Sequence, residues 1–265
     1  MKYKVICAMR TKNEEWIVDK TLKSLSNFCD KVVVYDDNST DRTVEICRSW
    51  DFVDLIPGEP RDEHFWEAGK QAQQLFDEVK VHNPDYILIL DADEIPTPSI
   101  VDFIENIPTD VNLFKTRMIN LTPDEKHYRI DSYRTPTGIN VDWNPFSKNS
   151  WSKHTLMKYD KNIDYTYQPY KVGLGSFGPF HPAPNNVPTP YMSVEDFYII
   201  HYGKISPSFL SGEKQKFYAM NDYKTGKGSY EQRLNHHMMC SGFGKEEPRN
   251  YVECNPKWFW EYKDE

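Results

Sequence analysis

Over its first hundred residues the chain alternates short apolar runs with longer segments of helical spacing, and this alternation constrains the fold most. The apolar runs are rich in β-branched residues and have the length of strands; they read YKVICAM at 3–9, KVVVYDD at 31–37, FVDLIP at 52–57 and YILIL at 86–90. The intervening segments, at 13–28, 39–50 and 62–82, have helical spacing, with Asn13 and Ser39 or Asp41 as N-cap candidates. Strands that alternate with helices predict a doubly wound α/β sheet whose ligands bind at the carboxyl ends of the strands.

After Pro96 the pattern becomes more mixed. We expect a helix at 99–107 and strands of a mixed sheet at 112–121, 126–134, 153–160 and 196–203. The proline-rich stretch 179–191 must be irregular, because proline fixes φ and removes a donor. Two helices are expected at 206–223 and 229–243, before an aromatic tail. The 265 residues then form one large domain, 1–205, with halves 1–96 and 97–205, and a helical and aromatic extension, 206–265, packed on it.

Composition excludes several classes of protein. Lys and Arg number 32 against 40 Asp and Glu, and the formal net charge of −8 disfavours a nucleic-acid partner. No run approaches the roughly 20 apolar residues of a membrane span, so we expect no transmembrane segment and a cytoplasmic location. The five cysteines are scattered without a CxxC pair, which predicts reduced thiols and no zinc knuckle.

The run YILIL ends abruptly on the acidic motif DADE, in which Asp91, Asp93 and Glu94 carry the charge. A Walker-B site would need a G-x-x-x-x-G-K-[ST] loop, which the chain lacks, and a D-x-D-x-[TV] phosphotransferase would need a hydroxyl where Ile95 stands. The remaining alternatives are a D-x-D site for a hard divalent cation and a plain acidic strand end facing water. The motif alone does not separate them.

A second acidic strand end favours the metal site. VVVYDDNSTDRT ends a strand on Asp36 and Asp37 and enters the next helix, so its carboxylates should lie at the same sheet edge as DADE. A turn and an N-cap explain Ser39 and Asp41 but not the two strand-end acids. A carboxylate at this edge can accept hydrogen bonds from a base or a ribose.

The motifs MRTKNEE, VVVYDDNSTDRT and ILILDADE, in this order and at these separations, resemble the nucleotide-sugar-binding half of glycosyltransferase family 2 proteins, which have the GT-A fold. The resemblance covers roughly the first hundred residues. It implies that Asp37, with Asp36 beside it, contacts the base. It also implies that Asp91 and Asp93 form the metal-binding D-x-D pair, with Asp93 the direct ligand and Asp91 nearer the ribose and the metal-bound water. Nucleotide-sugar contacts are further implied for Arg10, Thr11, Asn13, Glu14 and Lys70; at Lys70 many members have arginine.

In several GT-A enzymes a C-terminal histidine completes the metal shell, and a nearby basic residue contacts the diphosphate. His201, near the end of the expected strand at 196–203, and Lys204, directly after that strand, are at the corresponding positions. His181, His236 and His237 are interpreted as ordinary structural histidines.

The acceptor side is less well marked. Glu195 and Asp196 lie about as far after the D-x-D pair as the catalytic base of inverting family members, although they enter a strand instead of preceding a helix; Asp131 and Asp142 are weaker candidates. GLGSFG at 173–178 runs into PFHPAP and cannot open a helix, so it is not a dinucleotide fingerprint. The tail WFWEY could stack on a sugar or dock on the domain.

The sequence thus predicts a glycosyltransferase of GT-A fold that uses Mn²⁺ or Mg²⁺ and moves a sugar from a nucleotide-diphosphate donor, UDP- or GDP-linked, to a glycan or another acceptor. Two alternatives stay open. A nucleotidyltransferase usually has a Gly-rich basic loop near its first strand, and CAMRTKNEEW has no glycine. The other is an inactive GT-A domain that only binds.

Overall fold

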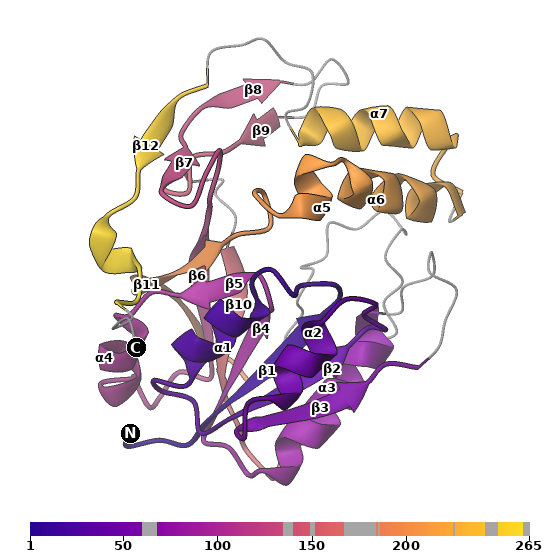
Figure 1. Cartoon of the computed structure of the whole chain (residues 1–265). Coiled ribbons are helices and arrows are strands. Elements are labelled where there is room, and N and C mark those ends of the chain that lie inside the picture. Colours follow the sequence, from indigo (N-terminus) through magenta and orange to yellow (C-terminus); the bar gives the residue numbers. More distant parts are fainter. Residues whose placement is uncertain are drawn as a thin grey trace.

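The computed structural model describes residues 1–59, 68–134, 140–148, 152–166, 184, 186–224, 226–241 and 249–261. Its centre is an eight-stranded mixed sheet in the order β3-β2-β1-β4-β10-β6-β11-β5 (Figure 1). In chain order these strands are β1 (Val5–Thr11), β2 (Lys31–Asp36), β3 (Val53–Pro57), β4 (Tyr86–Asp91), β5 (Glu94–Pro96), β6 (Leu113–Asn120), β10 (Ser152–Lys158) and β11 (Tyr191–His201).

The first half is the predicted doubly wound unit. Strands β3, β2, β1 and β4 are parallel, and alternate residues of each point to opposite faces. One face packs on α1 (Val18–Leu25) and α4 (Ile100–Glu105), and the other packs on α3 (Ala68–Val81). Helix α2 (Thr43–Arg48) lies between β2 and β3 along the chain. The α/β class is therefore confirmed, because apolar runs of this kind can be buried only between two helical layers.

In the second half, strands run in both directions. β10 is antiparallel to β4 and β6, β11 is parallel to β6, and β5 is antiparallel to β11. The carboxyl ends of β1, β2, β4, β6 and β11 consequently lie at one edge of the sheet, called here the carboxyl edge. Two small sheets complete the strands: β7 (His127–Arg129) with β12 (Tyr251–Glu253), and β8 (Ser132–Arg134) with β9 (Asn140–Asp142).

The C-terminal helices lie above the carboxyl edge (Figure 1). The helix expected at 206–223 is divided into α5 (Pro207–Leu210) and α6 (Glu213–Lys224), because Gly212 between them adopts φ +80°. Helix α7 (Tyr230–Cys240) packs against α6. The last turn, η1 (Pro256–Trp258), precedes Trp260, which stacks on Phe28 and donates a hydrogen bond to the Pro96 carbonyl.

Among the described residues, no helix combines the length and the apolar character that crossing a membrane requires.

Candidate active site

The Asp91–Asp93 turn at the end of β4 is fixed by buried contacts. Backbone N–H of Ala92 donates to the Arg10 carbonyl at 3.0 Å, and the Thr21 hydroxyl donates to the Ala92 carbonyl at 2.6 Å. Oε2 of Glu94 accepts the backbone N–H of Asp91 at 2.8 Å and is ion-paired with Lys153 in the core. Glu94, for which the sequence suggests no function, is thus a structural anchor of the turn.

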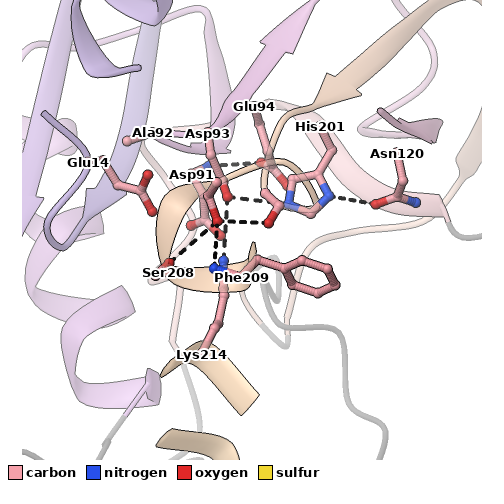
Figure 2. A network of polar contacts seen from close by, with 12 residues as sticks. Glu14, Asp91, Ala92, Asp93, Glu94, Asn120, His201, Ser208, Phe209 and Lys214 are labelled. Atoms are coloured by element: carbon pink, nitrogen blue, oxygen red, sulfur yellow. Dashed lines mark hydrogen bonds and ion pairs between the residues drawn. The ribbon is translucent and has the colours of Figure 1, made fainter. Parts of the chain in front are cut away.

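Asp93 and His201 face each other across the carboxyl edge (Figure 2). The Asp93 side chain is buried, and its Oδ2 lies 3.4 Å from Nε2 of His201. Nδ1 of His201 lies 2.6 Å from Oδ1 of Asn120, at the end of the neighbouring strand β6. Since a carboxamide oxygen only accepts, Nδ1 carries a proton, and Nε2 is the ring nitrogen that faces Asp93. A carboxylate oxygen and a ring nitrogen therefore converge, and Asn120 is a second-shell partner of the kind that metal-bound histidines usually have.

Gly203 keeps the space beside these donors open. A Cβ at this position would meet Nε2 of His201 and lie 2.5 Å from Oδ2 of Asp93, closer than real Cβ contacts come. Its φ is not left-handed, so the side-chain space, and not the backbone, requires glycine here. The residues thus fit a cation that takes Asp93 and His201 as ligands.

The described residues contain no group of three or more His, Cys, Asp or Glu side chains arranged around one metal position. Asp91, expected as part of the ligand set, has Oδ1 at 3.6 Å from the Arg10 guanidinium. With two protein donors, a hard cation would take further ligands from water and diphosphate oxygens, as Mg²⁺ commonly does.

Charged side chains from distant elements surround Asp93. Nζ of Lys214, on α6, lies 3.6 Å from Oδ2 of Asp93. Burial opposes the charge of Lys214, but Asp93 and its neighbours raise the pKa of Lys214 above its ordinary value. Burial, and then the charge of Asp93, raise the pKa of Glu14 to about 8, while Trp16 donates to its Oε2 at 2.7 Å. Burial and the charge of Lys214 lower the pKa of Lys204 to about 8.

The other acidic strand end lies further along the same edge. Oδ1 of Asp37 accepts from Gln71 at 2.9 Å, and its Oδ2 lies 3.8 Å from the Lys12 ammonium. Asp36 and Asn13 make hydrogen bonds within the loops that follow β2 and β1. Oδ2 of Asp36 accepts the backbone N–H of Ser39 at 3.0 Å.

Asn13, at φ 54°, joins the loops that follow β1 and β2. Its N–H donates to the Ser39 hydroxyl and its Oδ1 accepts the N–H of Thr40, both at 2.8 Å. Thr11, at the end of β1, is buried and pairs in register with Asp36. The residues that the resemblance assigns to the nucleotide, apart from Lys70, therefore come together at the carboxyl edge or its loops.

The structure does not bring Lys70, Glu195 and Asp196 to this cluster. Nζ of Lys70 is paired with Glu59 at 2.5 Å on the surface. Glu195 and Asp196 are exposed in the bulged middle of β11, well before His201, and Oε1 of Glu195 lies 3.0 Å from Arg117.

The weaker acidic candidates have local partners. Asp131 is ion-paired with Arg129, and Asp142 accepts the N–H of Asn144 at 3.0 Å.

Lys204 lies over the ring of Phe209, with its Nζ 4.8 Å from the ring centroid. His237 contacts Asp222 at 2.9 Å, whereas His181 and the GLGSFG segment lie outside the described residues.

The sequence model of Glycosyl transferase family 2 matches residues 7–173, more than half of the chain. The chain belongs to Glycosyl transferase family 2. The predicted family, and with it the GT-A fold, is confirmed. The matched span includes the Asp37 and Asp93 strand ends of this family 2 protein and stops before His201, Gly203 and Lys214.

Curated relatives agree with the family assignment. An uncharacterized glycosyltransferase of Rickettsia bellii is 26% identical over 182 residues, which cover 66% of this chain and 59% of that protein. The dTDP-rhamnosyl transferase RfbG of Shigella flexneri is 26% identical over 167 residues, covering 58% of this chain and 57% of RfbG. The chain thus spans less than three fifths of the length of these relatives.

Among solved structures, Staphylococcus aureus TarS 1-349 in complex with UDP-GlcNAc aligns over 89% of this family 2 chain and 73% of its own, at 14% identity and a TM-score of 0.47. A similarity at this level says nothing about the substrate of the present chain.

Three residues of the site were not predicted. Asn120, Gly203 and Lys214 lie on or beside elements whose pairing with the Asp93 turn is not visible in local sequence. The only available signal was Gly203 itself, two residues after His201 in HYGK.

Proposed function

We propose that this protein is a divalent-metal-dependent glycosyltransferase that moves a sugar from a nucleoside-diphosphate sugar to an acceptor. The observation that carries the proposal is the convergence of Asp93 Oδ2 and His201 Nε2 at 3.4 Å, beside a space that only glycine at 203 leaves open. A carboxylate oxygen and an imidazole nitrogen that converge beside an open space can serve as ligands of one divalent cation. Asp37 at the same edge supplies an acceptor for a base or ribose.

The relative named dTDP-rhamnosyl transferase supports a nucleoside-diphosphate sugar as the donor class. In the proposed complex, Asp37 and its loop hold the nucleoside, while Asp93 and His201 hold Mn²⁺ or Mg²⁺. Asn120 keeps His201 in the tautomer that can bind, and Glu94 holds the backbone of the turn. A bound cation would offset the charge that develops on the departing diphosphate, a contribution of several kcal/mol.

Lys204 is proposed to add positive charge near the diphosphate, and Arg10 and Asp91 to line the ribose side. Glu195 and Asp196 remain proposals for the base that deprotonates the acceptor, because no other described acid combines their position after the D-x-D pair with exposure on β11. The acceptor itself is left open between glycan, lipid and protein.

The first experiment is Asp93→Asn with a panel of UDP-, GDP- and dTDP-sugars and Mn²⁺. We expect donor turnover, measured as nucleotide release, to be abolished while circular dichroism and the melting temperature show a folded protein. Asp110→Asn is the matched control, since it removes one exposed aspartate in a loop after α4. Retained turnover in Asp93→Asn would sink the proposal. A wild type that binds donors without turning any over would favour the inactive binding domain.

A further inference from the structure

Lys214 places a positive charge at the oxygen that the proposed metal would use. It lies in α6, outside the region matched by the family, yet its Nζ is 3.6 Å from Oδ2 of Asp93 (Figure 2). The same oxygen faces Nε2 of His201 at 3.4 Å. The ammonium and the imidazole therefore approach one carboxylate oxygen from two different elements, α6 and β11.

A buried carboxylate needs a counter-charge, and removing that partner is costly. Asp93 is 4% exposed, so its carboxylate is largely removed from water. In the structure Lys214 provides a counter-charge to Asp93, and its side chain is 28% exposed.

Metal binding changes this balance, because a divalent cation on Oδ2 would repel an ammonium 3.6 Å from the same atom. We infer that Lys214 is a built-in competitor of the divalent cation at Asp93, so that metal entry displaces Lys214 and loosens the docking of α6 on the site. This inference rests on the proposed metal-dependent function. Displaced from Asp93, Lys214 can pair with an oxygen of the incoming diphosphate, which makes metal binding stronger when the donor is present.

The competition can be measured without any turnover, by calorimetric titration of the full chain with Mn²⁺ alone. Lys214→Met should bind Mn²⁺ at least about tenfold more tightly than the wild type, which corresponds to about 1.4 kcal/mol. Lys216→Met is the matched control, because it removes an exposed lysine of the same helix, and its affinity should equal that of the wild type. Lys214→Arg keeps the charge and should also resemble the wild type.

A second measurement covers the effect of the variant on folding. In chelator, Lys214→Met should melt at a lower temperature than the wild type, since Asp93 loses its counter-charge, and Mn²⁺ should raise its melting temperature more than it raises that of the wild type. If Lys214→Met does not fold, Lys214→Gln removes the same charge but retains a donor for Asp93.

The outcomes separate the two hypotheses. Mn²⁺ binding by Lys214→Met and Lys214→Gln that is equal to or weaker than that of the wild type, with binding lost in Asp93→Asn, would overturn the competition and leave the metal site standing. Mn²⁺ binding by Asp93→Asn as tight as that of the wild type would overturn both, as would absence of binding in the wild type and in the Lys214 variants alike.

Discussion

Replacing Gly203 with alanine changes the space beside Asp93 and His201 by a single methyl group. That methyl would stand 2.5 Å from Oδ2 of Asp93 and also meet Nε2 of His201, whereas real Cβ atoms essentially never come within 3.0 Å of another heavy atom. Each donor must therefore move by at least about half an ångström. Metal–ligand distances tolerate only about 0.2 Å, so the displacement is large enough to spoil a cation site.

We expect Gly203→Ala to weaken Mn²⁺ binding by about 10- to 100-fold, the size of effect seen when the surroundings of metal ligands are disturbed. Donor turnover should fall at least in proportion. The crowding should also cost about 1–3 kcal/mol of stability, as overpacking in cores does. Calorimetric Mn²⁺ titration, nucleotide release and chemical denaturation measure the three effects separately.

Gly226→Ala is the matched control. A Cβ there meets nothing within 4 Å, but φ is +78°, so alanine would cost about 1–2 kcal/mol through backbone strain alone. Its Mn²⁺ affinity should be unchanged although its stability falls. If Gly203→Ala binds Mn²⁺ as tightly as the wild type and remains folded, no cation uses the space between Asp93 and His201.

Two predictions concern stability. Because burial raises the pKa of Glu14 from 4.5 to about 8, the folded state binds more protons than the unfolded state between these values. The free energy of unfolding should therefore fall by up to about 1.4 kcal/mol per pH unit as pH rises through this window. Denaturation in chelator from about pH 5 to about pH 8 measures this slope; Glu14→Gln should abolish it, and an unchanged slope in that variant would contradict the assignment. Lys153→Met leaves the buried charge of Glu94 without its partner and should lower the free energy of unfolding by about 3–5 kcal/mol. The double variant Lys153→Met/Glu94→Gln should recover part of this loss. A loss below about 1 kcal/mol in Lys153→Met would show that the pair is unimportant for stability.

The nucleotide half was predictable because its signals are local. The run Tyr86–Asp91 is apolar on both faces, and such a strand can only lie between helical layers, so the position of the following acids at the carboxyl edge follows from the chain itself. The proximity of Asp37 and Asp91 to one edge follows from parallel strand order. These inferences need no knowledge of contacts between distant segments.

The features that could not be predicted depend on contacts between segments that are distant in the sequence. Strand β5 is three residues long and pairs with β11, about a hundred residues later, so no periodicity reveals it. Lys214 reaches Asp93 only because a new helix, α6, starts after Gly212. The left-handed conformation of Gly212 cannot be predicted from a sequence pattern that is otherwise helical. For Lys70, the pairing with Glu59 likewise arises from the fold and not from spacing. Family resemblance supplied His201, which local reasoning alone would have left an ordinary histidine.

The pairing of β5 with β11 makes the candidate site sensitive to strand alignment. His201 is opposite Glu94, and Ile200 is opposite Ile95, so Asp93 meets His201 because β11 ends where β5 begins. A slip of one residue would turn His201 to the other face of the sheet and bring Ile200 into its place. The bulge between Val194 and Ile199 lies upstream and can absorb length changes before the final three pairs form. Insertions and deletions in β11 should therefore be tolerated in the bulge and harmful after it, even where no site residue is altered.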